Sequence, residues 1–171
     1  MKKVILSIVI LIFLAGCNGL YNISNFILPN DPEFLILIEE LDTPKKTCQY
    51  MQDNFEYENN SIALSPYQLF LIKKGDCDDF KNWAIYFPNC HGYETYQILI
   101  EFPSYEYEDD GYHMIGVFKE GDYYNISENM LYIECFCKCF EEIMNFHLYR
   151  GWISYIVYDY KMSFIEQGYN N

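Results

Sequence analysis

Residues 33–87 place apolar and polar side chains with the spacing of short helices. Thr43, Ser65 and Asp76 each stand just before such a segment and are residue types that cap helix N-termini. Gly75 suits a left-handed C-cap for the third segment, and Pro88 is expected to stop the fourth. The pattern therefore predicts helices over residues 33–41, 44–55, 66–72 and 77–87.

After Pro88 the pattern changes to segments rich in β-branched and aromatic residues, which are typical of strands. The segments 112–118 and 122–128 flank Lys119-Glu120-Gly121 and are expected to form a hairpin. One more helix is predicted over residues 134–149, and an acidic, Tyr-rich loop over 104–111. The remaining predicted strands are 94–102, 152–159 and 162–166. Helices followed by an antiparallel sheet with one late helix indicate the α+β class.

The N-terminus has the features of an export signal. Lys2 and Lys3 precede an apolar run of 11 residues, Val4–Leu14, which is shorter than the roughly 20 residues of a membrane-spanning helix. Leu14-Ala15-Gly16-Cys17 resembles the lipobox of bacterial lipoproteins, and this resemblance implies cleavage before Cys17 and its lipidation by palmitate-type acyl chains. We expect a cell-envelope protein, anchored on the extracytoplasmic side of a membrane, with this organisation: signal peptide 1–16, lipidated tether 17–32 and a single domain 33–171.

The formal net charge of −14 falls to −16 once Lys2 and Lys3 are removed with the leader. Nucleic-acid binding needs a basic surface, so this function class is excluded. The chain has 18 Tyr and 13 Phe, and this aromatic content indicates a packed core rather than a disordered acidic tail.

Six cysteines follow Cys17, and their pairing cannot be read from spacing. Cys135, Cys137 and Cys139 alternate without the two-residue gaps of zinc knuckles, so packing or disulfide pairing is favoured over a metal site. We expect no metal and no cofactor.

Cys77 opens the predicted helix 77–87, where Phe80, Ala84 and Phe87 share its face. A helix N-terminus favours a thiolate, and its free N–H groups can stabilise an oxyanion. Asp76, Asp78 and Asp79 oppose thiolate formation, so a nearby imidazolium is required. The alternative is a Cys77 that serves as a small buried apolar residue.

His113 lies on a predicted strand and is the candidate base for Cys77. Folding of the hairpin brings Glu128 or Asn129 opposite His113, where a side chain can orient the imidazole. Glu128 ranks first, Asn129 second and Asn125 third. Two further histidines, His91 and His147, are interpreted as structural. The alternative for His113 is also a structural role, as a buried histidine with a hydrogen-bond partner in a non-catalytic domain.

These residues resemble the bacterial transglutaminase-like proteins over about residues 50–160. Gly75-Asp76-Cys77-Asp78-Asp79-Phe80 looks like their nucleophile segment, residues 113–118 like their histidine strand, and residues 123–129 like the strand of their third residue. The resemblance implies a papain-like fold, with the cysteine helix packed on an antiparallel sheet that carries the histidine. The sequence departs from the family at the third position, where an aspartate is usual and Glu128 or Asn129 stands.

Two functions follow as hypotheses. The first is a lipid-anchored extracytoplasmic thiol hydrolase or acyltransferase of peptidase, amidase or transglutaminase type, acting on amide bonds of peptides or proteins. The second is a non-catalytic surface lipoprotein that binds an envelope or host partner, with the loop Tyr105–Asp110 as its contact region.

Overall fold

Helices and sheet are segregated along the chain in the computed structural model, which describes residues 29–103, 111–146 and 151–170. Four helices come first: α2 (Pro32–Glu40), α3 (Pro44–Asn54), α4 (Pro66–Ile72) and α5 (Cys77–Cys90). Six antiparallel strands follow: β3 (Glu94–Glu101), β4 (Tyr112–Glu120), β5 (Tyr123–Glu128), β6 (Leu131–Cys137), β7 (Ser154–Asp159) and β8 (Phe164–Tyr169), with α6 (Phe140–Met144) between β6 and β7. The predicted α+β class is confirmed.

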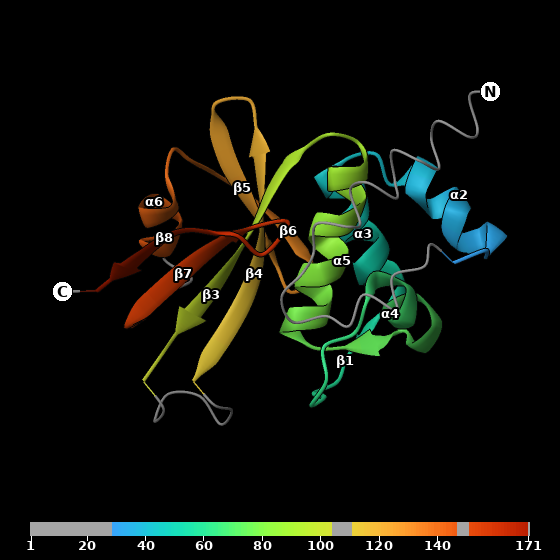
Figure 1. Cartoon of the computed structure of the whole chain (residues 1–171), viewed down its shortest axis with the longest axis horizontal. Coiled ribbons are helices and arrows are strands. Elements are labelled where there is room, and N and C mark those ends of the chain that lie inside the picture. The colour runs from blue at the N-terminus through green and yellow to red at the C-terminus, as the bar shows by residue number, and fades with distance from the viewer. Residues whose placement is uncertain (1–28, 104–110, 147–150, 171) are drawn as a thin grey trace.

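The strand order in the sheet is β6-β5-β4-β3-β7-β8, which places β4 and its histidine in the interior of the sheet. A separate parallel pair, β1 (Glu56–Tyr57) with β2 (Lys74–Gly75), joins the chain after α3 to the segment just before α5. In Figure 1 the helices α2 to α5 gather on one side of the molecule, and the sheet with α6 forms the other. No helix in the described part of the chain combines the length and apolar character needed to cross a bilayer.

The predicted helix starts are confirmed by their caps. The side chain of Thr43 accepts a hydrogen bond from the backbone N–H of Lys46 at 3.3 Å. Ser65 forms a reciprocal capping box with Gln68, and Asp76 caps α5. Each cap satisfies donors that a helix cannot satisfy internally, so these short polar residues fix where the helices begin.

The prediction of Gly75 as a C-cap was wrong, because Lys73 takes the left-handed conformation with φ 63° and ends α4. Gly75 instead pairs with Tyr57 in the parallel β1–β2 bridge. A Cβ added at Gly75 would lie 2.6 Å from Oδ2 of Asp79. This glycine is therefore needed for close approach rather than for a turn.

Two helix boundaries also differ from prediction. Helix α5 continues through Pro88 to Cys90; a proline this close to a helix end removes a single backbone donor. The predicted helix 134–149 was wrong over its first residues, because residues 131–137 form β6 and pair with β5. Only Phe140–Met144 is helical, and residues 147–150 lie outside the described residues. The tertiary pairing of β6 overrides the local helical pattern.

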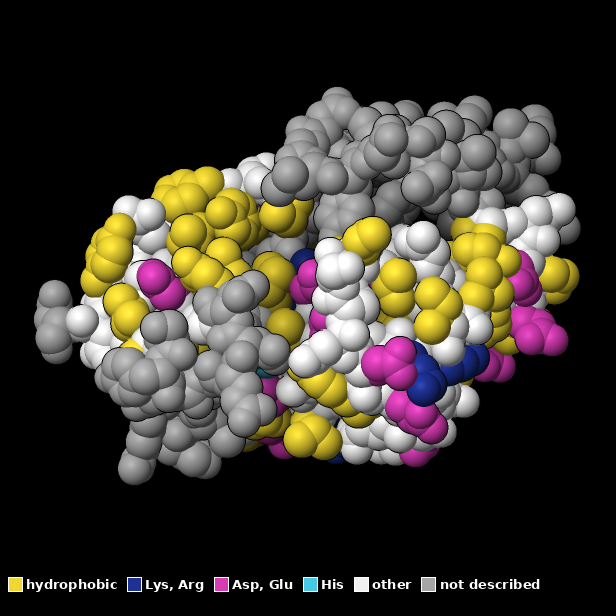
Figure 2. All heavy atoms as spheres, turned by 90° about the horizontal axis from the view of Figure 1, so that it is seen from below, with side chains coloured by type: hydrophobic (Ala, Val, Ile, Leu, Met, Phe, Trp, Pro, Cys, Tyr) yellow, Lys and Arg dark blue, Asp and Glu magenta, His cyan; other side chains and the backbone are white. Residues whose placement is uncertain are grey.

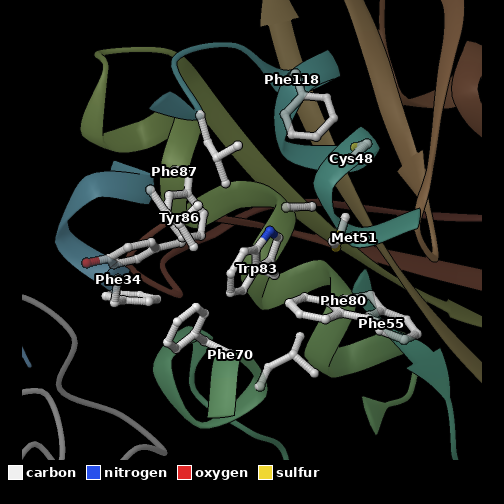
Figure 3. Close-up of a cluster of buried hydrophobic side chains, with 14 residues drawn as sticks. Phe34, Cys48, Met51, Phe55, Phe70, Phe80, Trp83, Tyr86, Phe87 and Phe118 are labelled. Atoms are coloured by element: carbon white, nitrogen blue, oxygen red, sulfur yellow. The ribbon is translucent and has the colours of Figure 1, made fainter. Parts of the chain in front are cut away.

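Two hydrophobic clusters lie on opposite sides of the sheet. The first joins α2 to α5 with Phe118 of β4, and Figure 3 shows its aromatic side chains converging around Trp83. The second contains Ile115 and Val117 of the same strand together with residues of α6. Gly116, between them, lets α5 approach β4, because a Cβ there would lie 3.1 Å from Cγ2 of Ile85. The predicted packing of the cysteine helix on the histidine-bearing sheet is confirmed.

The surface is consistent with the acidic composition. On the face shown in Figure 2, hydrophobic side chains gather over the sheet half, and a group of basic side chains lies beside acidic ones on the helical half. Among the exposed ion pairs of the described residues, Lys74 of β2 pairs with Glu56 and with Glu58, and Lys119 of β4 pairs with Glu94 of β3. In these pairs two of the eleven Lys and Arg residues lie beside carboxylates, which weakens the attraction of these two to an anionic polymer.

Candidate functional site

Cys77 occupies the first turn of α5 and is partly buried. Its position is fixed by the capping box of Asp76, whose side chain accepts from the N–H of Asp78 at 3.3 Å while its own N–H donates to Oδ2 of Asp79 at 3.0 Å. The N–H of Cys77 belongs to the first helical turn, where no preceding helical carbonyl is available as a partner. The helix therefore presents both a thiol and the positive end of its dipole at one point.

His113 and Glu128 form the second part of the site. Nε2 of His113 and Oε1 of Glu128 are 2.8 Å apart, and the side chains are 18% and 21% exposed. Burial lowers the pKa of His113, but interactions with the Cys77 thiol and with Glu128 outweigh burial and raise this pKa to about 9. The imidazole is therefore protonated at neutral pH and stands beside the sulfur.

The ring orientation follows from the Glu128 contact. A carboxylate accepts hydrogen bonds, so the Nε2 nitrogen of His113 carries the proton that Glu128 binds. Nδ1 is then the ring nitrogen left for the thiol of Cys77, which interacts with the same imidazole. This is the arrangement that a thiol, a base and an orienting acceptor require.

The three candidates for the orienting residue differ in what they contact. Glu128 contacts His113 directly. Asn129 has φ 49° and donates from Nδ2 to Oε1 of Glu128 at 3.4 Å, so it contacts the carboxylate rather than the imidazole. Asn125 is engaged elsewhere, by Glu120 at 2.9 Å and by the N–H of Phe136 at 3.1 Å.

Strand alternation does not account for the contact between His113 and Cys77. Alternation assigns His113 to the face of Ile115 and Val117, and those two residues belong to the second hydrophobic cluster. Gly116, on the other face, is the position that meets the middle of α5. His113 is the second residue of β4, so it lies at the start of the strand, three residues before the glycine that meets the middle of α5.

Asp79 has a structural role that sequence reasoning missed. It is fully buried, and its carboxylate accepts from Nδ2 of Asn60 and from the N–H of Leu64, both at 2.5 Å, and from the N–H of Asp76. These bonds fasten the segment before α4 to the start of α5. The spacing Asp76-x-x-Asp79 before an apolar helix is a capping-box pattern, and it is the signal that would have identified this role.

Asp78 differs from its neighbours in protonation. Burial, then a hydrogen bond and charge repulsion from Asp76 and the charge of Asp79, raise the pKa of Asp78 to about 7. A substantial share of Asp78 is therefore neutral at physiological pH. The negative charge next to Cys77 is smaller than three aspartates in a row suggest.

Carboxylate oxygens of Asp76, Asp78 and Asp79 lie within 4.8 Å of one another. Asp76 and Asp79 are already acceptors for backbone and side-chain donors of the chain itself, including Asn60. The cluster is explained by its role in fastening the start of α5, and we assign no ion to it.

Lys81 is the other site residue that sequence reasoning missed. It lies one helical turn after Cys77, is 4% exposed, and donates from Nζ to Oδ1 of Asn82 and to Oε1 of Gln97, both at 2.8 Å. Burial lowers the pKa of Lys81 to about 8, against the opposing effects of Asp78, Cys77 and Asp79. The sequence around Lys81 gives no sign of this burial, since Phe80 before it is apolar but Asn82 after it is polar.

The other candidate ligands do not join the site. Nε2 of His91 lies 2.6 Å from the backbone oxygen of Ile38, and His147 lies outside the described residues. The six described cysteines are all free. Cys135 donates to the backbone oxygen of Tyr124, and Cys137 to that of Cys135, so these thiols have packing and hydrogen-bonding partners. Cys139 precedes α6 at the N-cap position.

Comparison with known proteins identifies the N-terminus. Residues 1–18 match the model of the prokaryotic membrane lipoprotein lipid attachment site, and these residues include Cys17. The protein is therefore a lipid-anchored protein of the cell envelope. The predicted tether, residues 17–32, lies mostly outside the described residues, and so does the loop Tyr105–Asp110.

The chain is also similar in structure to calcium-bound LapG from Legionella pneumophila, at 15% sequence identity and a TM-score of 0.47. This similarity covers 74% of the present chain and 75% of the other. The sequence matches no curated protein.

Proposed function

We propose that the protein is a lipid-anchored thiol hydrolase or acyltransferase that acts on amide bonds outside the cytoplasm, with the lipid carried by Cys17. The proposal rests mainly on the contacts of the His113 imidazole. This ring interacts with the thiol of Cys77, and its Nε2 lies 2.8 Å from Oε1 of Glu128. The sequence resemblance to the transglutaminase-like family supports the same assignment.

In the proposed reaction, the proton of the Cys77 thiol is held on Nδ1 of the His113 imidazolium, and the thiolate attacks the amide carbonyl carbon. The N–H groups of the first turn of α5 stabilise the oxyanion that forms. The C–N bond then breaks as the imidazolium gives its proton to the leaving amine, and a thioester remains on Cys77. Water or a second amine, deprotonated by His113, attacks the thioester and releases an acid or a new amide.

Glu128 has a positioning role in this proposal. Its carboxylate fixes the ring of His113 and stabilises the imidazolium through the Nε2–H bond. Asn129 holds the carboxylate in turn through its 3.4 Å contact. The longer side chain at the position where the family usually has an aspartate is accommodated, because the bond to His113 has ordinary hydrogen-bond length.

The test is covalent labelling by a thiol-directed amide-mimic probe. We expect Cys77→Ala to abolish labelling while circular dichroism and thermal unfolding stay unchanged. Cys139→Ala, which removes an exposed thiol, is the matched control and should be labelled like the wild type. Equal labelling of wild type and Cys77→Ala would remove Cys77 from the mechanism.

A second candidate function, a non-catalytic module that binds an envelope or host partner, is favoured by one observation. Asp76 and Asp79 stand next to Cys77, and their charges disfavour a thiolate. Iodoacetamide reactivity of Cys77 against pH separates the two functions. A transition well below the unperturbed thiol value of about 8.5 supports the enzyme, and a transition at or above it supports the binding module.

A further inference from the structure

The burial of Lys81 is unusual because its ammonium has only neutral hydrogen-bond partners. Nζ donates to the amide oxygens of Asn82 and Gln97, and no carboxylate of the described residues lies within ion-pair distance of it. Moving an ammonium from water into the protein interior without a compensating anion has a large cost in folding free energy. Lysines as little exposed as Lys81, at 4%, are therefore rare. An anion nearby, even without direct contact, would reduce this cost.

The groups that interact electrostatically with Lys81 are Asp78, Cys77 and Asp79. The carboxylate of Asp79 is engaged by Asn60, Leu64 and Asp76. The carboxyl group of Asp78 is partly protonated near neutral pH. Cys77 is the group among these that becomes an anion by losing a thiol proton, and it lies four residues before Lys81, hence on the same side of α5.

Gln97 keeps the ammonium at this place. Its Oε1 accepts from Nζ at 2.8 Å, while its Nε2 donates to the backbone oxygen of Asp159 at 3.2 Å and contacts the sulfur of Met162. Because both ends of the amide are engaged, its oxygen is fixed toward α5. Lys81 therefore cannot swing to solvent without breaking a buried bond to the sheet.

We propose that Lys81 is a positioning residue of the active site, whose ammonium stabilises the thiolate of Cys77 from within the same helix. The inference rests on the proposed function, because it takes Cys77 as the nucleophile. His113 and Lys81 then act on the sulfur from two sides, the imidazolium from β4 and the ammonium from α5. Together they oppose the aspartates at the start of the helix.

In the described part of the chain, the charged groups around the sulfur come from α5, β4 and β5. From α5 and its cap they are Asp76, Asp78, Asp79 and Lys81, from β4 His113, and from β5 Glu128. The partner of Lys81 on β3, Gln97, is neutral. Removal of Lys81 therefore leaves a local excess of negative charge, and the thiolate should become harder to form.

The test follows alkylation of Cys77 by iodoacetamide against pH, read by mass spectrometry of the peptide that contains it. In Lys81→Met we expect the transition to move upward by roughly two pH units, as one charge about a helical turn away implies at an effective dielectric constant of about 20. Lys81→Arg keeps the charge and should stay near the wild type. Lys119→Met removes an exposed lysine and is the matched control. A Lys81→Met curve that coincides with the Lys119→Met curve would overturn the inference.

A second measurement does not depend on the folding of Lys81→Met. With ¹³Cε-labelled lysine, the Lys81 signal is assigned by its absence from Lys81→Arg and titrated in wild type and in Cys77→Ser. We expect Lys81 to titrate at lower pH in Cys77→Ser, because the anion that favours its charge is gone. Identical titration in the two proteins would overturn the inference.

These outcomes are separable from those of the proposed function. That function fails if wild-type Cys77 reacts only at or above its unperturbed range, whatever the variants do. The Lys81 inference is judged by differences between variants, so it can fail while the amide-mimic probe still labels Cys77.

Discussion

The contact between His113 and Glu128 makes a prediction about pH and stability. We expect Glu128→Gln to lower the pKa of His113 and to destabilise the protein at pH 6 more than at pH 9.5. Glutamine keeps an acceptor oxygen at nearly the same place but loses the negative charge that favours the imidazolium. The substitution therefore isolates the charge from the hydrogen bond that joins the two side chains at 2.8 Å.

The magnitude follows from the raised pKa. A histidine at about 9 instead of 6.5 favours the folded state by on the order of 3 kcal/mol when charged. Cys77 supplies part of this shift, so loss of the Glu128 charge should lower the pKa by about one unit, or about 1.4 kcal/mol. Because the folded pKa is raised, the contribution is complete below pH 6.5, declines above it and is lost as the pH passes about 9.

The assay combines two measurements in a Cys77→Ala background, where the imidazole no longer titrates together with a thiol. Proton NMR of the His113 ring gives its pKa, and urea unfolding at pH 6 and 9.5 gives the free energy of unfolding. The reasoning is refuted if His113 titrates at the same pH with and without the Glu128→Gln substitution, or if the loss of stability is equal at the two pH values.

Three further predictions concern the scaffold, each read from urea unfolding at pH 7. Ser65→Ala should cost about 1 kcal/mol through loss of the capping box, whereas Ser61→Ala, at an exposed position, should cost much less. Trp83→Ala should cost roughly 3–5 kcal/mol, because the fully buried indole is surrounded by other rings; a loss below 1 kcal/mol would contradict that packing. Gly116→Val should cost about 1–3 kcal/mol by pressing on Ile85 of α5, with Gly116→Ala intermediate between it and the wild type.

The starts of the helices were predictable because local chemistry sets them. Thr43, Ser65 and Asp76 satisfy N–H groups within three residues of themselves, and those bonds are visible in the sequence as short polar residues before apolar runs. The hairpin was equally local, since Gly121, with φ 67°, closes a short turn.

The failures depend on distant contacts. Residues 131–137 form a strand because the backbone of β5 pairs with theirs. The alternating cysteines at 135, 137 and 139 did not indicate this pairing. Lys73, and not Gly75, takes the left-handed conformation that ends α4. Gly75 instead pairs with Tyr57 in the β1–β2 bridge and lies against the carboxylate of Asp79. A tertiary neighbour decided each case.

Within the candidate site, the sequence supplied the residue types but not their full surroundings. Cys77, His113 and Glu128 were chosen from their positions on a helix start and a hairpin, and the structure brings them together. The buried lysine at position 81 could not be foreseen, because its partner Gln97 is 16 residues away on β3. Charged residues on helices are usually exposed, and only the packing of α5 on the sheet makes this one an exception.

The hairpin of β4 and β5 has a consequence for how the protein acquires its chemistry. His113 and Glu128 are 15 residues apart within one hairpin, so the acid–base pair can assemble on the microsecond timescale typical of such units. Cys77 belongs to a separate helix and lies 36 residues before His113 in the sequence. Its sulfur therefore reaches the imidazole only after α5 has packed against β4 at Gly116. Thiol reactivity should therefore be among the last properties to appear during refolding, which makes it a reporter of complete assembly rather than of secondary structure.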